Sequence, residues 1–229
     1  MKIIEHRQIC NSGNAKVQFM RIDPEDLATT LADILTALMN LSWLSKFDTD
    51  FEIGAFKSRA NKTIDDIKGK FKKCIDDKVA NDAGEYIVSE LAREAIVNEL
   101  NYLDIPLSEL LGKKKSGNPG FDFHSQNIGT DTIIFGESKY VATTTAYSSA
   151  LPQMIRFINE GKDVEDLPEL KPFCTSAALH RAYNGSKGFA AAFSAKRTSS
   201  DDIIENITKR ADYQSLLSYE EVILVAVNI

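Results

Sequence analysis

The stretch TIIFGESKY at residues 132–140 constrains the fold of this chain more than any other. Its apolar, β-branched start predicts a buried strand, and the charged residues Glu137 and Lys139 follow two positions apart. Alternate side chains of a strand point to the same face, so we expect this carboxylate and this ammonium group on one face. A charge near a protein core needs a partner, a metal ion or a catalytic role. The fold must supply one of these where the strand ends.

A second carboxylate, Asp122, lies upstream in GFDFHSQN, residues 120–127, which predicts a short strand of its own. The sequence NIGTD suits a hairpin-like connection between the two strands. If the strands are adjacent, Asp122 and Glu137 converge at one edge of the sheet with Lys139 beside them. Two carboxylates can hold Mg²⁺, which prefers oxygen ligands and keeps several waters. The metal acidifies a bound water, and the lysine positions that water or stabilises developing negative charge. The pattern therefore predicts metal-assisted phosphodiester cleavage.

An acid-x-Lys triplet alone is a weak sign of such a site, because the chain repeats it. The other triplets are Asp66-x-Lys68, Asp76-x-Lys78, Glu160-x-Lys162 and Glu169-x-Lys171. These lie in polar helical or loop sequence, which indicates solvated surface charge. For Glu137 and Lys139 alone, a structural ion pair at a strand end is the better explanation. Asp122 on the preceding strand and Glu85 on the preceding predicted helix shift the balance toward a metal-dependent site.

Hydrophobic periodicity and turn residues divide the rest of the chain into helices and strands. Further strands are expected at 3–9, 16–22 and 221–227, and helices at 24–41, 57–78, 85–103, 148–161, 176–183 and 201–215. Pro24 opens the first helix with Asp23 as its cap, and Gly161 lies near the end of the fourth. No element is assigned to GSKGFAAAFSAKR, residues 185–197, which has two glycines but lacks phosphate-loop spacing.

The order of these elements predicts the fold class. From residue 81 onward it runs helix, strand, strand, helix, further helices and strand, which indicates an α/β domain of mixed α+β character. A central sheet flanked by helices, in two or three layers, accommodates that order. We expect residues 1–80 to form an accessory strand and helix segment, available for docking a partner, and residues 81–229 to form the core.

Composition narrows the class of protein. An apolar fraction of 43% is ordinary for a globular chain, and the net charge of -6 argues against coating nucleic acid by bulk electrostatics. The three cysteines and three histidines show no paired spacing, which disfavours a disulfide framework or a zinc site. The longest apolar run, VILVAV, is far shorter than the roughly 20 residues of a membrane-spanning helix. MKIIEHRQ has no signal-peptide pattern, so we expect a cytoplasmic protein without a membrane segment.

Asp122, the Glu137-x-Lys139 strand end and the helix beginning Gly84-Glu85 together resemble the PD-(D/E)xK nuclease superfamily. The resemblance implies a restriction-endonuclease-like core with a central mixed sheet, and Mg²⁺- or Mn²⁺-dependent hydrolysis of DNA by an endonuclease or nickase. Asp122 and Glu137 would be metal ligands and Lys139 the catalytic lysine. In many members an acid from the first helix joins the metal site, which Glu85 would match.

The other positions that the resemblance touches are less specific. Glu90, one to two turns beyond Glu85, is a second candidate for the helical acid. Gln153, in the helix after the lysine, matches a polar residue that faces the site in some members. The family's proline before the first acid is absent here, because Phe121 precedes Asp122.

More narrowly, residues 81–160 are similar to the nuclease subunit of Hachiman anti-phage systems. The similarity rests on the GE-initiated helix, the G-x-D segment, the ESKY strand and TAYSSAL. In that family a helicase restrains the nuclease until aberrant DNA appears. The resemblance therefore implies a defence effector whose partners are DNA and a helicase subunit.

Several alternatives stay open on the sequence. Lys113, Lys114 and Lys115 either grip a DNA backbone or belong to a solvated loop. His124 either approaches the metal or phosphate, or is a surface residue that does neither. The basic helix at 57–78 offers a phosphate-binding face, or it is an ordinary exposed helix face or a docking surface for a partner protein. The alternative function is a non-catalytic module that keeps the nuclease-like sheet and binds a partner.

Overall fold

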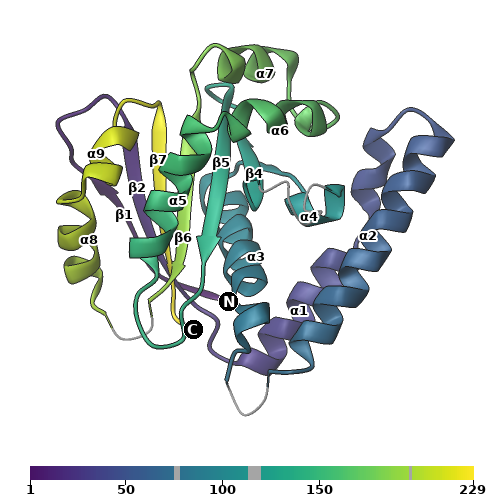
Figure 1. The fold of residues 1–229 in the computed structure, drawn as a ribbon, viewed down its shortest axis with the longest axis horizontal. Helices are drawn as coiled ribbons and strands as arrows, with labels where there is room; N and C mark the ends of the chain where they lie inside the picture. Colours follow the sequence, from purple (N-terminus) through teal and green to yellow (C-terminus); the bar gives the residue numbers. More distant parts are fainter. Residues whose placement is uncertain (75–77, 113–119, 196–197) are drawn as a thin grey trace.

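The computed structural model describes residues 1–74, 78–112, 120–195 and 198–229, which form a seven-stranded mixed sheet flanked by helices (Figure 1). The strands are β1 (Lys2–Ile9), β2 (Lys16–Asp23), β3 (Leu103–Asp104), β4 (Phe123–Asn127), β5 (Thr132–Lys139), β6 (Gly188–Ser194) and β7 (Glu221–Val227). Their order is β1-β2-β7-β6-β5-β4-β3. The four central strands β2, β7, β6 and β5 are parallel, and the outer strands pair antiparallel. The predicted mixed α/β class is confirmed.

Two layers of helix cover the sheet, and each buries its own apolar cluster. The helical elements are α1 (Leu27–Met39), the 3-10 helix η1 (Ser42–Lys46), α2 (Asp50–Phe71), α3 (Asn81–Leu100), α4 (Ser108–Leu111), α5 (Tyr147–Asn159), α6 (Lys162–Leu170), α7 (Ser176–Tyr183), α8 (Ser200–Thr208) and α9 (Ala211–Leu216). One cluster joins α1, α2 and α3 to the sheet, and the other joins α5 to α9 to it. Successive residues of β5 alternate between them: Ile134 belongs to the first cluster and Phe135 to the second.

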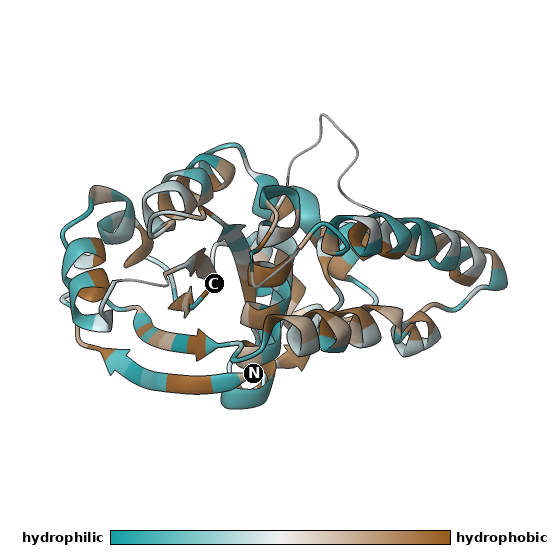
Figure 2. Ribbon diagram, turned by 90° about the horizontal axis from the view of Figure 1, so that it is seen from below, coloured by the Kyte–Doolittle hydropathy of each residue, from teal (hydrophilic) through white to brown (hydrophobic). Residues whose placement is uncertain are grey.

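The N-terminal strands belong to this same sheet. β2 pairs in parallel with β7, from Lys16 opposite Glu221 to Ile22 opposite Val227. Residues on both sides of the expected boundary at 81 therefore share one sheet, and α1 and α2 share an apolar cluster with α3. The α1–α2 pair also extends away from the sheet, as Figures 1 and 2 show from two directions.

The structure confirms most expected elements and corrects several details. The helix expected at 57–78 is α2, which begins at Asp50 and ends at Phe71, and the helix expected from Glu85 begins at Asn81. β1, β2, β7 and α7 lie where the sequence places them, and β4 and β5 form the expected antiparallel hairpin. The predicted cap Asp23 is wrong, because α1 begins at Leu27 and the side chain of Asp26 accepts a hydrogen bond from the Thr29 amide. The single helix expected at 201–215 is two helices, since Arg210 has an extended backbone between α8 and α9.

The sequence analysis assigned no element to β6, and it also missed the short elements β3 and α4 and the helix α6. The β6 sequence GFAAAFS is rich in alanine, which has low β propensity, yet all of its residues are buried at the centre of the sheet. This segment forms a strand because it packs between two helical layers, and not because of its intrinsic propensity. Position 188 requires glycine, because a Cβ there would lie 2.9 Å from the carbonyl oxygen of Glu221.

One described segment, Leu27–Lys46, is long and apolar enough to span a membrane by composition. It covers α1 and η1, and Ile34 and Leu38 from α1 are buried in the cluster with α3. A core helix of a soluble domain has the same composition, so this segment is only weak support for a membrane span. The part of the chain that the structure describes is folded and contains one such helix.

Candidate active site

Asp122 and Glu137 lie together where β4 begins and β5 ends. Regular pairing of the two strands stops at Phe123 opposite Gly136. One residue earlier, the Asp122 amide donates to the Gly136 carbonyl at 2.8 Å, and the Ser138 amide donates to Asp122 Oδ2 at 2.7 Å. The carboxylate thus takes the place of a backbone acceptor in the ladder. This bond fixes the buried Asp122 side chain beside residues 137 to 139.

Lys139 joins carboxylates from two different elements. Its Nζ atom lies 2.9 Å from Glu137 Oε1 and 3.0 Å from Glu85 Oε1, and it donates to the Ser138 carbonyl at 3.0 Å. The Glu137 side chain is 0% exposed and that of Glu85 is 47% exposed, so the group runs from the core to the surface. The structure therefore brings together four sequence-predicted residues: Glu85, Asp122, Glu137 and Lys139.

The surrounding carboxylates set the charge of Lys139. Burial by itself lowers the pKa of this ammonium group, but the carboxylates of Glu137, Asp122 and Glu85 outweigh burial and raise the pKa. Lys139 is therefore a stable cation at neutral pH. It suits the stabilisation of negative charge and does not suit the acceptance of a proton.

Close packing of α3 on Tyr140 places Glu85 beside Lys139. A Cβ at Gly84 would lie 2.2 Å from ring atoms of Tyr140, so only glycine allows the start of α3 to approach this closely. The Tyr140 hydroxyl also donates to the Val79 carbonyl at 3.3 Å, just before the helix. Gly84 thus determines the distance between α3 and the end of β5.

Glu90, the second candidate for the helical acid, lies elsewhere. Its side chain is 2% exposed, and its Oε1 lies 2.5 Å from Nη2 of Arg93. Arg93 also pairs with Asp104 of β3. The pairing with Arg93 accounts for Glu90, and Glu85 is the α3 acid beside Lys139.

His124 is buried, so the expectation of a surface residue is wrong. Its Nε2 lies 2.8 Å from Asp166 Oδ2 and its Nδ1 lies 3.2 Å from the Ser108 hydroxyl. Its ring also packs edge-on against Phe135 at 5.4 Å between centroids. Ser108, His124 and Asp166 are each at most 2% exposed. This serine, histidine and acid form a hydrogen-bonded core cluster joining α4, β4 and α6, which spacing in the sequence does not reveal.

The remaining predicted residues have no established place at the site. Gln153 is half-buried on α5, a helix that packs against β5 and β6. Lys113, Lys114 and Lys115 lie outside the described residues.

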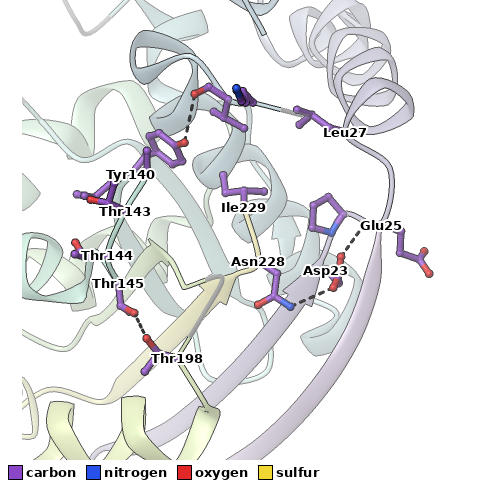
Figure 3. Close-up of a pocket in the computed structure, with 15 residues that line it drawn as sticks. Asp23, Glu25, Leu27, Tyr140, Thr143, Thr144, Thr145, Thr198, Asn228 and Ile229 are labelled. Carbon is purple, nitrogen blue, oxygen red and sulfur yellow. Dashed lines mark hydrogen bonds between the residues drawn. The ribbon is translucent and has the colours of Figure 1, made fainter. Parts of the chain in front are cut away.

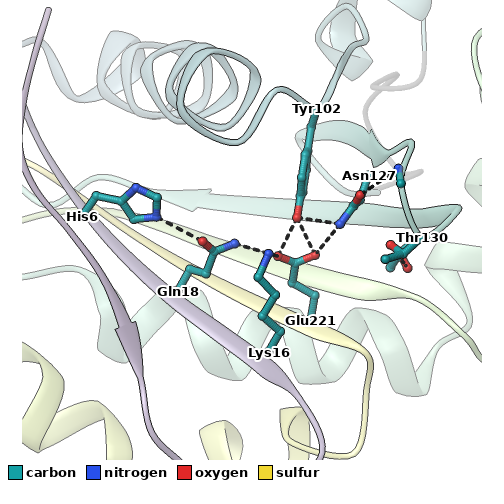
Figure 4. Close-up of polar contacts among 9 residues, drawn as sticks. His6, Lys16, Gln18, Tyr102, Asn127, Thr130 and Glu221 are labelled. Atoms are coloured by element: carbon teal, nitrogen blue, oxygen red, sulfur yellow. Dashed lines mark hydrogen bonds and ion pairs between the residues drawn. The ribbon is translucent and has the colours of Figure 1, made fainter.

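Another buried acid lies at the amino ends of the parallel strands, where β7 begins (Figure 4). Glu221 is 3% exposed and lies within 2.7 and 2.8 Å of the Tyr102 hydroxyl through its two oxygens. Gln18 donates to it at 2.7 Å, and Asn127 donates to the Tyr102 hydroxyl at 2.8 Å. Burial and the Glu221 carboxylate raise the pKa of Tyr102, so this phenol stays protonated and acts as a donor. The group ties the segment between α3 and β3 to the strands β2, β4 and β7.

The donor chemistry of the acids around Lys139 fits a magnesium ion. Within residues 1–74, 78–112, 120–195 and 198–229, no group of three or more histidine, cysteine, aspartate or glutamate side chains is arranged as a metal site. Mg²⁺ commonly uses only one or two protein carboxylates and keeps several waters. Asp122, just before β4, and Glu137, in β5, supply that number beside the Lys139 ammonium group.

A cleft of about 730 Å³ has Tyr140 and the residues after it in its lining (Figure 3). It is lined by residues that follow β2, β5, β6 and β7, so it lies at the carboxyl ends of the parallel strands. Tyr140, the residue after Lys139, forms part of its wall. No local pattern in the sequence indicates this cleft, because its lining comes from five separate segments.

Comparison of the chain with protein families, with curated proteins and with solved structures finds no match.

Proposed function

We propose that this chain is a Mg²⁺- or Mn²⁺-dependent DNA nuclease of the PD-(D/E)xK type, acting as an endonuclease or nickase. The observation that carries the proposal is the contact of Lys139 with carboxylates of Glu85 and Glu137, beside Asp122. In this proposal it is a cytoplasmic effector of an anti-phage system that a helicase partner restrains. That biological setting rests on the similarity of residues 81–160 to the Hachiman nuclease subunit.

The residues divide the chemistry between them. Asp122 and Glu137 would hold the metal ion, which acidifies a bound water and neutralises charge on the phosphate when bound. Lys139, whose pKa is raised by the carboxylates, stabilises negative charge on the phosphate and orients water without taking its proton. Glu85 holds the Lys139 ammonium group in place from α3.

A second candidate function is a non-catalytic module that binds a partner protein. The pairing of Lys139 with both Glu85 and Glu137 favours it, because a structural ion-pair network makes the same contacts. The extension formed by α1 and α2 would provide the surface for the partner (Figure 1).

Plasmid nicking in the presence of Mg²⁺ tests the catalytic proposal. Asp122→Ala, Glu137→Ala and Lys139→Ala are each expected to reduce the rate by at least about 100-fold, a usual loss for charge-stabilising groups in active sites. Asp66→Ala and Lys68→Ala are matched controls, since they alter the same acid-x-Lys pattern at exposed positions of α2. Both controls are expected to nick as wild type. Unchanged nicking by all three folded site variants would refute the proposal.

A further inference from the structure

The cleft beside Tyr140 has the position of a ligand site in an open α/β sheet. In such sheets, ligands bind in the crevice outside the carboxyl ends of the parallel strands. Strands β2, β7, β6 and β5 are parallel and all end at this cleft. We propose that it binds unpaired nucleotides of the strand whose phosphate reaches Lys139, so that the substrate is single-stranded or locally unpaired nucleic acid. This inference rests on the proposed nuclease function.

Hydroxyl groups line the side of the cleft after β5. Thr143 and Thr144 are exposed there, and Thr145 Oγ1 lies 2.5 Å from Thr198 Oγ1 (Figure 3). This last contact ties the segment after β5 to the segment after β6 and fixes the wall. Threonine hydroxyls donate to phosphate and sugar oxygens without specifying a base.

Acceptors line the opposite side, after β2. The Asp23 carboxylate accepts from the Glu25 amide at 2.8 Å and from Asn228 Nδ2 at 3.2 Å, which holds it in place. A carboxylate has about four acceptor positions, so it retains capacity for another donor. Carboxylates accept hydrogen bonds from base amino groups, whereas they repel phosphates. The two walls therefore suit a nucleotide whose base lies on the Asp23 side and whose sugar-phosphate backbone lies on the Thr143 side.

The size of the cleft favours unpaired nucleotides over a duplex. A volume of about 730 Å³ lies within the range of about 300 to 1,000 Å³ typical of small-ligand sites, enough for nucleotides but not for a double helix. The net charge of -6 also gives little general attraction for a duplex backbone. Tyr140 lines the cleft and follows Lys139 directly, so a strand lying there ends next to the proposed catalytic group.

Binding without metal tests the inference on the full chain. A short fluorescent DNA single strand of mixed sequence is titrated with protein in EDTA, and the same sequence is tested as a blunt duplex. The single strand is expected to bind more tightly. The double variant Thr143→Val/Thr144→Val is expected to weaken this binding about tenfold, because two hydroxyl donors are lost. Thr36→Val, an exposed threonine on α1, is the control and is expected to bind as wild type.

A second variant blocks the cleft instead of changing its hydrogen bonds. Ala142 is exposed in the lining, and Ala142→Trp is expected to exclude the strand while keeping the thermal unfolding midpoint of wild type. Equal binding of duplex and single strand, no binding of either, or wild-type binding by both cleft variants would overturn the inference. Loss of nicking in the site variants together with any of these results would leave the nuclease proposal standing. Strand binding in EDTA with no cleavage of either the strand or the plasmid in Mg²⁺ would refute the nuclease proposal and keep the cleft as a nucleotide site.

Discussion

Of the two carboxylates in contact with Lys139, the sequence predicts the contact with Glu137 from strand geometry, but it does not determine which acid of α3 makes the other contact. The alternation of strand side chains predicted that Glu137 and Lys139 meet, and their atoms lie 2.9 Å apart. The sequence favoured Glu85 over Glu90 as the helical acid but kept both as candidates, because both lie on one helix. Tertiary packing at Gly84 decided between them, and no local pattern contains that information. The same holds for His124, whose partners Ser108 and Asp166 come from α4 and α6.

The pKa of Lys139 provides a prediction at this scale. Glu137 is the largest of the carboxylate contributions that raise it, so Glu137→Gln is expected to lower the pKa of Lys139. An NMR titration of lysine side chains measures it, with the Lys139 signal assigned by its loss in Lys139→Arg. Asp66→Asn, an exposed acid on α2, is expected to leave the value unchanged.

The stability that the Glu137–Lys139 pair contributes to the fold decreases at high pH. Because the folded-state pKa is raised, the stability from this pair is fully present below the ordinary lysine pKa of about 10.4 and is lost as pH rises through the raised value. An unaltered Lys139 pKa in Glu137→Gln would mean that the carboxylate does not control the lysine.

At the scale of elements, strands with β-branched residues were predictable and the alanine-rich strand was not. β5 and β7 carry long apolar runs, and both were located from the sequence. β6 has the composition of a helix or a loop, and its place between β5 and β7 depends on pairing with strands far away in the sequence. Local propensity therefore identified β5, which carries Glu137 and Lys139, and missed β6, which pairs with it.

The approach of α3 to β5 gives a prediction on two glycines. Gly84→Ala is expected to destabilise the fold by about 1–3 kcal/mol, since its Cβ would overlap Tyr140 at 2.2 Å and force the ring or the helix to move. Gly69→Ala, in α2 with nothing within 4 Å of its Cβ, is expected to stabilise by about 1 kcal/mol through helix propensity. Urea unfolding of both variants measures these changes. Equal effects of the two substitutions would contradict the packing argument.

At the scale of the whole molecule, the N-terminal strands extend a single sheet. The sequence predicted β1 and β2 correctly but assigned them to an accessory segment, because the pairing of β2 with β7 joins residues about 200 positions apart. That pairing also brings Asp23 to the cleft. The cleft and the acids around Lys139 thus lie at the same end of the parallel strands, and only the assembled fold brings them there.

Calorimetric titration of the full chain with Mn²⁺ tests the central claim most directly, namely that Asp122 and Glu137 form a site for a hard divalent cation. Wild type and Asp66→Asn are expected to bind Mn²⁺ saturably. Asp122→Asn/Glu137→Gln, which keeps the side-chain shapes, is expected to lose that binding. Binding by the double variant as tight as that of wild type, or no binding by wild type, would contradict this claim.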